Sequence, residues 1–519
     1  MYIEPNTVIK FYSGIPLDNS YENTLYFGSL SAQNSYFHGT LPKHTIQRNT
    51  YQRKDKGIMR VGKSADDLYD CNYLAFQNTN YGTKWFYAFI TGVDYVNNET
   101  AEVKYEIDVM QTYLFDATLK ECLVVREHSL TDKIGDNLVE EPIACGDVIC
   151  QRINKTSSWF DNYQIVVCVS RPPNDTSHTY DGDFISGLYS GCKYRAFPYN
   201  NTGKTDLNDF LNNLTDNSLQ DTVVSIFMMP STISVSEQAT SLGSYYHEIP
   251  TALNGYTPHN NKLFTYPYSY LKCSTGESEI DYRYELFSII PTTERQFSFS
   301  LEACCTTNPQ ILLSPSGYNG DGVGDSVTNI PHSLVLDGFP QLAWSIDSYR
   351  AWVAQQGVGN NLQKAVGGLS AIGGIASTVA SGNPLSAIGG ALALGNAYNK
   401  EYIAKRSPDR ARGQNTGTIT TATRTKNFYF MEMCLNPSYA KIIDEYFDKY
   451  GYATNRVKVP NRNSRKHWNY VQTNGCLIIG KMPSDDIKKM QSIYDKGITF
   501  WKNANEVGMY STYANDNKV

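Results

Sequence analysis

The sequence predicts a mainly β protein with some α+β character, and three observations support this fold class. Tyrosine is unusually frequent, with 39 copies among 519 residues, and aromatic residues favour strands and protein interfaces. Short stretches of alternating apolar and polar residues recur between turns rich in Asn, Gly and Pro, which is typical of strands. Strands and helices also alternate in the last hundred residues. A hydrophobic content of 41% permits large cores and excludes wholesale disorder.

The N-terminal part, residues 1–128, is expected to contain several strands and two short helical pieces. Ser64 is placed to cap a short helix that carries Asp66 and Asp67 in its first turn. A helical turn is predicted over 110–115. The sequence NNET separates two long alternating stretches and so predicts a hairpin. The predicted strands are 58–63, 73–77, 84–96, 101–109 and 122–127.

The middle region, residues 129–345, is polar and interrupted by many turn signals. Loops such as NGDGVGD (319–325) separate short apolar stretches. This pattern predicts an all-β region. The predicted strands are 147–153, 163–170, 222–229, 285–291, 296–305 and 333–336.

The C-terminal part, residues 426–519, has the clearest signals. Pro437 and Gly451 bracket one helix, while Ser484 is expected to cap a second helix that ends at Gly497. The order of elements is β-α-β-β-α-β, which is a split βαβ pattern. The predicted strands are 427–435, 455–459, 467–479 and 498–501.

One segment, 361–402, differs from the rest of the chain. It contains LSAIGG twice and carries no charged residue between Lys364 and Lys400. Two halves, 365–380 and 385–399, flank the turn signal SGNP. Each half would make a helix about 22 Å long, which is shorter than the roughly 30 Å of bilayer hydrocarbon. One half alone is therefore a poor transmembrane helix, whereas a hairpin of both halves could enter a thinned bilayer or line a pore.

This segment contains a set of apolar residues that could enter a membrane and a flanking set of cations. The alternative is a glycine-rich core hairpin that only packs subunits together. The cations are suited to contact lipid headgroups. The apolar set is Val366, Leu369, Ile372, Ile375, Val379, Leu385, Ile388, Leu392, Leu394 and Tyr398, and the cations are Lys364, Lys400, Lys405 and Arg406.

Composition and motifs argue against several other functions. A net charge of −6 disfavours a protein that clamps nucleic acid through its phosphates. No catalytic motif, phosphate-binding loop or metal-ligand spacing is present, so we predict no cofactor, no metal and no enzyme activity. His247, Glu248 and His259 are the residues that a hydrolase site could use. The N-terminus shows no secretory signal. The scattered cysteines are expected to be free thiols of a protein made in a reducing cytosol.

Two blocks of the chain, 58–128 and 427–501, resemble the tail knob proteins of small short-tailed phages (podoviruses) that infect Gram-positive bacteria. These proteins are also called distal tail tube or major tail proteins. The motifs that match in order are YGTKWFYAF (81–89), EIDVMQTY (106–113), VREH (125–128), YGY with NRVK (450–458), NYVQT (469–473) and GITFW (497–501).

The resemblance implies a homohexamer. Residues 1–128 and 426–519 would build a β-barrel tube domain, 129–345 a wider knob, and 346–425 a hydrophobic loop with its flanks. The protein would be a virion component of the distal tail, assembled in the host cytoplasm, that conducts double-stranded DNA without sequence-specific binding. The loop would plug the tube and penetrate the host membrane, and other tail proteins would be partners. A receptor-binding tail module and a tail-tip cell-wall hydrolase are the alternatives.

Overall fold

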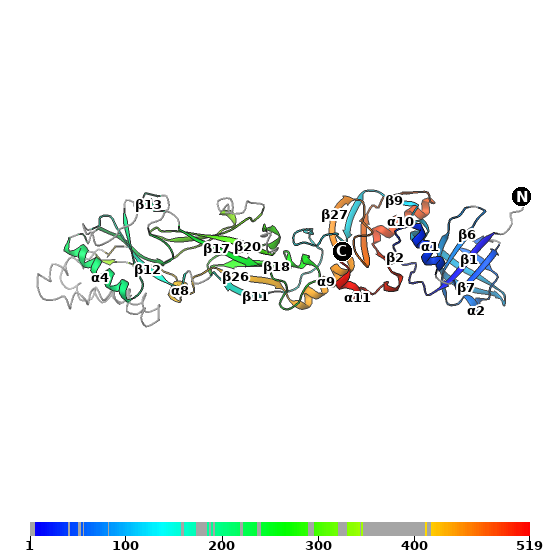
Figure 1. The fold of residues 1–519 in the computed structure, drawn as a ribbon, viewed down its shortest axis with the longest axis horizontal. Coiled ribbons are helices and arrows are strands. Elements are labelled where there is room, and N and C mark those ends of the chain that lie inside the picture. Colours follow the sequence, from blue (N-terminus) through cyan, green and yellow to red (C-terminus); the bar gives the residue numbers. More distant parts are fainter. Residues whose placement is uncertain are drawn as a thin grey trace. The chain divides into compact units, whose positions relative to one another are not determined.

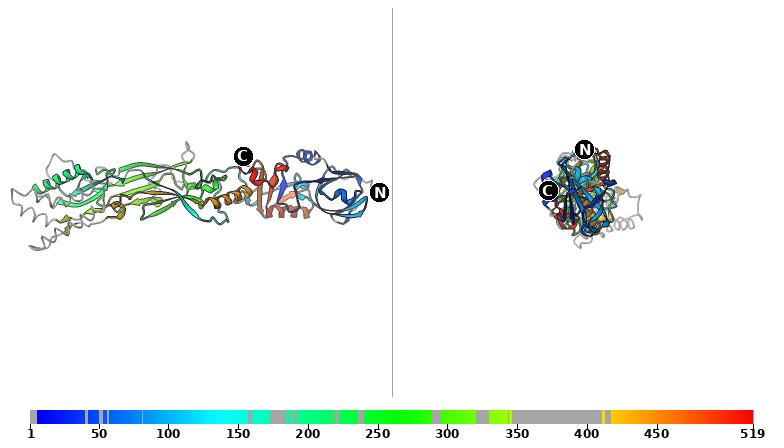
Figure 2. Two further views of the ribbon diagram at one scale, coloured as in Figure 1. Left: turned by 90° about the horizontal axis from the view of Figure 1, so that it is seen from below. Right: turned by 90° about the vertical axis from the view of Figure 1, so that its right-hand side faces the viewer.

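A computed structural model of the chain contains two compact units (Figures 1 and 2). Unit 1 comprises Met1–Val148, Thr251–Tyr268 and Leu435–Val519, and unit 2 comprises Ile149–Pro250 and Ser269–Cys434. Most of the described elements are strands, which confirms the predicted mainly β class. The structure describes residues 6–39, 42–49, 53–55, 57–80, 82–156, 160–172, 184–185, 188–189, 192–217, 219, 222–235, 240–288, 295–319, 330–342, 344–345, 411–412 and 417–518.

The N-terminal part of unit 1 forms a seven-stranded antiparallel sheet in the order β3-β1-β6-β7-β8-β5-β4. The predicted strands and the hairpin are confirmed as β5, β6 and β7–β8. Ser64 caps α2 (Ala65–Leu68) as predicted, because its hydroxyl accepts a hydrogen bond from Asp67 N at 3.2 Å. The strands are β1 (Thr7–Ser13), β3 (His44–Asn49), β4 (Arg53–Asp55), β5 (Ile58–Val61), β6 (Cys71–Asn78), β7 (Phe86–Asn97) and β8 (Thr100–Ile107).

This sheet curls, and one of its faces is filled with side chains. Its two edge strands, β3 and β4, are joined by residues 50–52 alone, so their nearest ends lie within roughly 14 Å of each other. Side chains from five strands meet in one buried cluster that includes Ile9, Met59, Leu74 and Val103. The face is therefore packed rather than hollow.

The second sheet of unit 1 interleaves strands from both ends of the chain, in the order β2-β30-β28-β10-β27. Strands β2 and β30 run parallel, and the other neighbours are antiparallel. Its core contains Trp468, Trp501 and Phe500, packed in one cluster with Tyr73 and Tyr87 of the first sheet. The strands are β2 (Asn23–Leu25), β10 (Cys122–Glu127), β27 (Tyr452–Lys458), β28 (Trp468–Asn474) and β30 (Ile498–Trp501), beside the short pair β9 (Ala117–Leu119) and β29 (Ile478–Gly480).

The helices of unit 1 follow the sequence signals closely. Asn436 caps α9, and Gly451 and Gly497 end α9 and α10 as predicted. The cap of α10 differs from the prediction, because Pro483 holds the N-cap position and Ser484 is the first helical residue. The helices are α1 (Leu30–Gly39), α3 (Val109–Tyr113), α9 (Pro437–Tyr450), α10 (Ser484–Lys496) and α11 (Tyr510–Tyr513), with 3-10 turns at Ala504–Glu506 and Ala514–Asp516.

The split βαβ arrangement is not formed within one sheet. Strand β26 (Tyr429–Leu435), predicted as its first strand, pairs with β18 of unit 2 instead of with β27, β28 or β30. The order of elements along the chain matches the prediction, but the pairing does not. The alternating pattern of β26 specifies a buried face without specifying which strands cover it.

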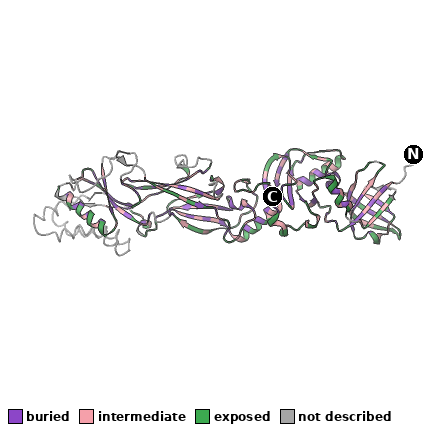
Figure 3. Cartoon of the chain, in the orientation of Figure 1, coloured by how far each residue is buried: buried purple, intermediate pink, exposed green. Residues whose placement is uncertain are grey.

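Among its described residues, unit 2 contains three four-stranded sheets and two short strand pairs. Buried residues alternate with less buried ones along strands such as β18 and β20, whereas β12 is buried along most of its length (Figure 3). The predicted strands near 147–153, 163–170, 222–229, 296–305 and 333–336 are confirmed. The sheets are β11 (Val148–Lys155), β26, β18 (Ser269–Ser274) and β19 (Glu279–Tyr282); β15 (Lys193–Pro198), β12 (Tyr163–Val169), β16 (Val223–Pro230) and β23 (Gln341–Leu342); and β17 (Thr240–Glu248), β20 (Gln296–Cys304), β21 (Gln310–Pro315) and β22 (Leu334–Leu336). The pairs are β13 (Phe184–Ile185) with β14 (Leu188–Tyr189) and β24 (Trp344–Ser345) with β25 (Ala411–Arg412).

Two predictions for the middle region are wrong. The region is not all-β, because α4 spans Asn201–Asp216. A short helix, α8 (Ile419–Ala422), lies outside this region, just before β26. Leu207, Phe210 and Leu214 of α4 are buried at helical spacing. The predicted strand at 285–291 begins instead as a 3-10 turn, Tyr284–Leu286. Burial of Tyr284 and Phe287 accounts for its apolar pattern.

Replacing Gly451 by alanine should destabilise unit 1 strongly. Gly451 has φ +67°, and a Cβ there would lie 2.3 Å from the Glu127 carbonyl oxygen and 2.6 Å from His128 N. Backbone strain and this clash together should cost about 3 kcal/mol or more. The check is the urea midpoint followed by tryptophan fluorescence. Gly508→Ala is the control, since its φ is +83° but nothing lies within 4 Å. Equal midpoints for the two variants would contradict the prediction.

Candidate functional site

The residues predicted to act in a membrane lie outside the described part of the chain. All ten apolar residues from Val366 to Tyr398 fall there, as do the cations Lys364, Lys400, Lys405 and Arg406. The NGDGVGD loop lies there too, from residue 320 on. Among the described residues, no helix has the length and apolar character needed to cross a membrane.

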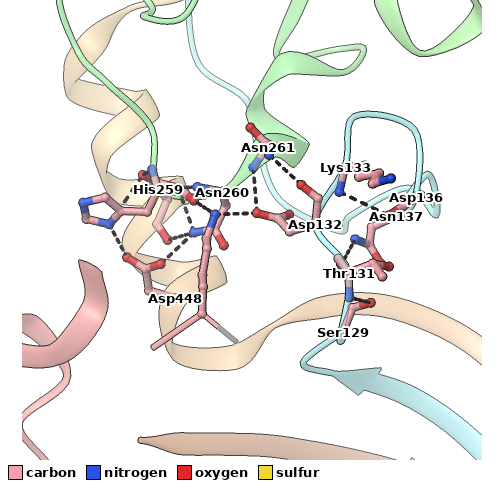
Figure 4. A network of polar contacts seen from close by, with 12 residues as sticks. Ser129, Thr131, Asp132, Lys133, Asp136, Asn137, His259, Asn260, Asn261 and Asp448 are labelled. Carbon is pink, nitrogen blue, oxygen red and sulfur yellow. Dashed lines mark hydrogen bonds and ion pairs between the residues drawn. The ribbon is translucent and has the colours of Figure 1, made fainter. Parts of the chain in front are cut away.

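A network of polar contacts in unit 1 joins three separate stretches of the chain (Figure 4). We call it the polar clasp and define it as Asp132, Glu141, His259, Asn260, Asp444 and Asp448. Helix α9 supplies Asp444 and Asp448, one turn apart. The stretch after β10 supplies Asp132 and Glu141, and the segment Thr251–Tyr268 supplies His259 and Asn260.

Asp444 is the most enclosed member of the clasp, with 0% exposure. Its Oδ1 accepts hydrogen bonds from Asn260 N at 3.0 Å and Asn260 Nδ2 at 2.8 Å. Its Oδ2 accepts from the Tyr256 hydroxyl at 2.7 Å and from His259 N at 2.6 Å. Each carboxylate oxygen therefore has two donors, all of them from the segment 251–268.

Asp448 lies one turn further along α9 and binds the same segment. Its Oδ2 lies 2.7 Å from His259 Nδ1, and its Oδ1 accepts from Asn260 Nδ2 at 2.7 Å. Burial raises the pKa of the Asp448 carboxyl, although the hydrogen bond with His259 opposes this shift. The pair therefore holds the Asn260 amide and the His259 ring in one orientation.

Asp132 connects the segment 251–268 to the last residues of the chain. Its Oδ2 accepts from Asn261 N at 3.2 Å, and the same oxygen lies 2.5 Å from Lys518 Nζ. The Tyr452 hydroxyl contacts Asp132 Oδ1 and lies 2.9 Å from Asn260 Oδ1. Figure 4 shows Asp132 facing Asn261, with Asp448 facing His259 and Asn260.

Glu141 binds two buried cations. Its Oε1 accepts from Lys262 Nζ at 2.5 Å and from Ala453 N at 2.8 Å, and its Oε2 pairs with Arg126 Nη2. The side chain of Glu141 is 0% exposed, that of Lys262 3% and that of Arg126 6%. Burial lowers the pKa of the Lys262 amine, whereas the charge of Glu141 raises it. Arg126 Nη1 also donates to the Gly451 carbonyl at 2.6 Å.

The clasp is built for holding chain segments rather than for turnover. Every carboxylate oxygen of Asp444 and of Glu141 already accepts from donors of the chain itself. None of these oxygens is left to bind a substrate or a metal ion. In the parts of the chain that the structure describes, no three His, Cys, Asp or Glu side chains group as a metal site. His247 and His259, the histidines considered for a hydrolase, belong to different units.

His247 instead lies in a buried group in unit 2. Its Nε2 is 3.4 Å from Glu432 Oε1, and Arg152 Nε donates to the same oxygen at 2.8 Å. Burial lowers the pKa of His247 to about 4, so the ring is neutral at neutral pH. The Arg152–Glu432 contact joins β11 to β26, while the His247 ring of β17 stacks on Phe430 of β26.

The basic cluster around Arg465–His467 is also used within unit 1. Lys466 pairs with Asp516, and His467 Nδ1 lies 2.7 Å from Glu506 Oε2. Lys458 pairs with Glu127. The first two contacts hold the C-terminal segment beside the start of β28, and the third joins β27 to β10, so these basic residues serve the fold of their own chain.

Comparison with known proteins assigns the family. A family model described as the C-terminal domain of the tail knob protein gp9 of Bacillus phage phi29 matches residues 231–518. A second, described as the N-terminus of the caudoviral major tail protein, matches residues 5–118. The chain belongs to the tail knob protein family. It is accordingly a structural component of a phage tail, as the motifs of the sequence predict.

Similar proteins cover nearly the whole tail knob chain. The tail knob proteins gp9 of Bacillus phages B103 and phi29 are each 25% identical to it over 97% of this chain and 98% of their own. The structure of the bacteriophage C1 tail knob protein gp12 superimposes with a TM-score of 0.64 over 98% of this chain and 99% of that one, at 15% identity. The last comparison supports the fold alone.

Sequence reasoning missed the clasp of this tail knob protein, although one signal was available. Ala440, Ile443 and Phe447 form the buried stripe of α9, and Asp444 falls within that stripe. A carboxylate on an apolar helix face needs partners. The partners, 184 to 188 residues away in sequence, could not be named without the structure.

Proposed function

We propose that this tail knob protein forms a hexameric distal tail knob and tube that conducts double-stranded DNA during genome ejection. The observation that carries this proposal is the family match over residues 231–518 and 5–118. Residues 1–128 and 426–519 are assigned to the tube, 129–345 to the knob and 346–425 to a hydrophobic loop. Other tail proteins adjoin it, it is assembled in the host cytoplasm, and it has no enzymatic role.

The packed sheet of unit 1 supports a conduit between subunits rather than within one. The cluster around Leu74 and Val103 fills one face of the curled sheet with side chains of a single chain, and a barrel of about seven strands would be far too narrow for duplex DNA. Six chains at −6 each carry 6 × −6, or −36. A lumen surrounded by acidic protein would let DNA pass with little adhesion.

The second half of the proposal concerns the loop. Its apolar residues, from Val366 to Tyr398, would plug the tube before infection and enter the host membrane afterwards. Each half is too short to span a bilayer alone, so several copies would have to act together. Small residues four apart, such as Ala387, Ala391 and Gly395, permit close helix contacts in lipid. Lys364 and Lys400, with the cations that follow, would contact headgroups.

Deleting residues 365–399 should abolish membrane permeabilisation while leaving assembly intact. The segment would be replaced by a Gly/Ser linker of equal length, and dye release from liposomes would be measured. Negative-stain images of both proteins should show six-fold rings with a central hole. A monodisperse monomer in the unaltered protein would contradict the hexamer.

Point variants test the loop at constant length. Ile372→Asp with Ile388→Asp should reduce dye release at least tenfold, because buried charge in lipid costs about 2.5–3.5 kcal/mol per residue. Ser381→Asp, in the SGNP turn, is the matched control and should leave release near normal. Equal leakage from the deletion variant and the unaltered protein would reject membrane action by this loop.

A further inference from the structure

Two cysteines from distant parts of the chain lie near each other where β10 begins and β28 ends. Leu123 of β10 is opposite Asn474 of β28, and further along Lys120 N donates to the Leu477 carbonyl at 2.9 Å. Cys122 and Cys476 lie between these two points on the facing chains. Both chains therefore remain paired on either side of the two cysteines.

The two thiols are close neighbours, because each is near enough to shift the pKa of the other. Gly475, at φ +70°, interrupts the side-chain alternation of the strand before Cys476, which lets that thiol turn toward Cys122. Asp495 fixes the turn, because its Oδ1 accepts from Thr473 Oγ1 at 2.7 Å and from Cys476 N at 3.0 Å.

The pair lies just below the surface. Cys122 is 6% exposed and Cys476 5% exposed, while their neighbours Glu121, Gly475 and Leu477 are exposed. A small oxidant can reach such a position through local opening of the turn. Burial raises the pKa of both thiols, that of Cys476 to about 12, so thiolate is scarce and reaction is slow.

We propose that Cys122 and Cys476 form an oxidation site, whose two thiols become a disulfide when the protein meets a peroxide outside a reducing cell. The register places Cys122 opposite Gly475 and Cys476 opposite Glu121, so the two cysteines are diagonal neighbours on chains about 4.8 Å apart. That spacing lies within the range that a disulfide bridges, and bond formation requires the two side chains to turn toward each other. The inference rests on the assignment of this protein to the phage tail, which leaves the cytosol, and not on the hexamer or the loop.

The chemistry balances with hydrogen peroxide as the oxidant. One thiolate attacks the peroxide and, with its proton, yields a sulfenic acid and one water. The second thiol attacks the sulfenic sulfur, forms the S–S bond and releases a second water. Two thiols together lose two protons and two electrons, and one peroxide becomes two waters. Glutathione and thioredoxin would oppose this reaction in the cytosol.

The disulfide would join the two ends of unit 1 covalently. The closed loop would run from Cys122 to Cys476 and contain all of unit 2. Closing so long a loop restricts the unfolded chain and should raise the thermal midpoint of unit 1. The free particle would then be more resistant to unfolding than the newly made protein.

Peptide mapping of the full-length protein tests this proposal. The purified protein is incubated with hydrogen peroxide, denatured with N-ethylmaleimide present, and digested without reduction. We expect one linked peptide pair joining Cys122 to Cys476, about 2 Da lighter than the two free peptides together, and a thermal midpoint several degrees higher. Cys122→Ser and Cys476→Ser should each lose the link, whereas Cys150→Ser, which removes an exposed thiol, should keep it.

The outcome is decided on the unaltered chain even if a variant fails to fold. Both cysteines recovered as alkylated thiols after peroxide treatment would overturn the proposal. So would sulfinic acid at either position without the linked pair, because that product shows that the second thiol does not reach the first. A midpoint that rises equally in the Cys122→Ser variant would remove the stabilising role.

Discussion

Replacing Glu141 by alanine should destabilise the tail knob protein by about 3–5 kcal/mol, since it leaves buried cations without their counter-charge. Arg126 and Lys262 both bind this carboxylate at side-chain exposures of 6% and 3%. Ala453 N would also lose its acceptor. The loss of stability equals the free energy of keeping two unpaired charges buried, which is larger than the net stabilisation that the original ion pairs supplied.

Two comparisons separate this effect from the loss of any salt bridge. Glu106→Ala removes an ion pair with Lys489, in which the side chain of Lys489 is 32% exposed and that of Glu106 is 41% exposed. Losing this exposed pair should cost no more than about 1 kcal/mol. Replacing Arg126, Glu141 and Lys262 together by Met, Leu and Met should recover most of the loss, because no buried charge remains unpaired. The thermal midpoint by tryptophan fluorescence is the measurement. A single variant as stable as the triple variant would refute the argument.

Asp444→Ala should have an effect of similar size, about 3–5 kcal/mol, because it removes one acceptor from several buried donors. Two of these donors are backbone N–H groups, those of His259 and Asn260. They cannot rotate to find water as a side chain can. The segment 251–268 should therefore detach first, and limited proteolysis should show early cleavage within it.

The matched controls for Asp444 come from its own surroundings. Glu445→Ala, on the same helix at 63% side-chain exposure, should change stability by less than about 0.5 kcal/mol. Tyr256→Phe removes a single donor to Asp444 and should cost about 1 kcal/mol. If Asp444→Ala unfolds at the same urea concentration as Tyr256→Phe, the clasp does not hold the segment in the way that its contacts indicate.

The elements of unit 1 were largely predictable because their signals are local. The caps at Ser64 and Asn436 and the stops at Gly451 and Gly497 each act within a few residues. Alternation in β6, β7 and β8 depends only on which face of a strand is buried. The α4 helix was missed because its Asn- and Asp-rich exposed face resembles a loop, although Leu207, Phe210 and Leu214 follow helical spacing.

Strand partners and the clasp were not predictable, because they depend on segments far apart in the chain. Alternation in β26 is equally compatible with β28 and with β18, and only packing selects β18. The segment 251–268 lies between two strands of unit 2 and yet belongs to unit 1. Nothing in its composition separates it from the loops around it.

The sequence by itself determined the β class, most of the local elements, the family and the place of the hydrophobic segment between Lys364 and Lys400. These properties follow from periodicity, capping residues and short motifs, each of which is local. The tertiary structure alone decided that both ends of the chain share one sheet and that Asp444 accepts hydrogen bonds from the backbone of His259 and Asn260. It alone also placed Cys122 beside Cys476. Such contacts depend on how distant surfaces exclude water from each other, and no local pattern encodes that choice.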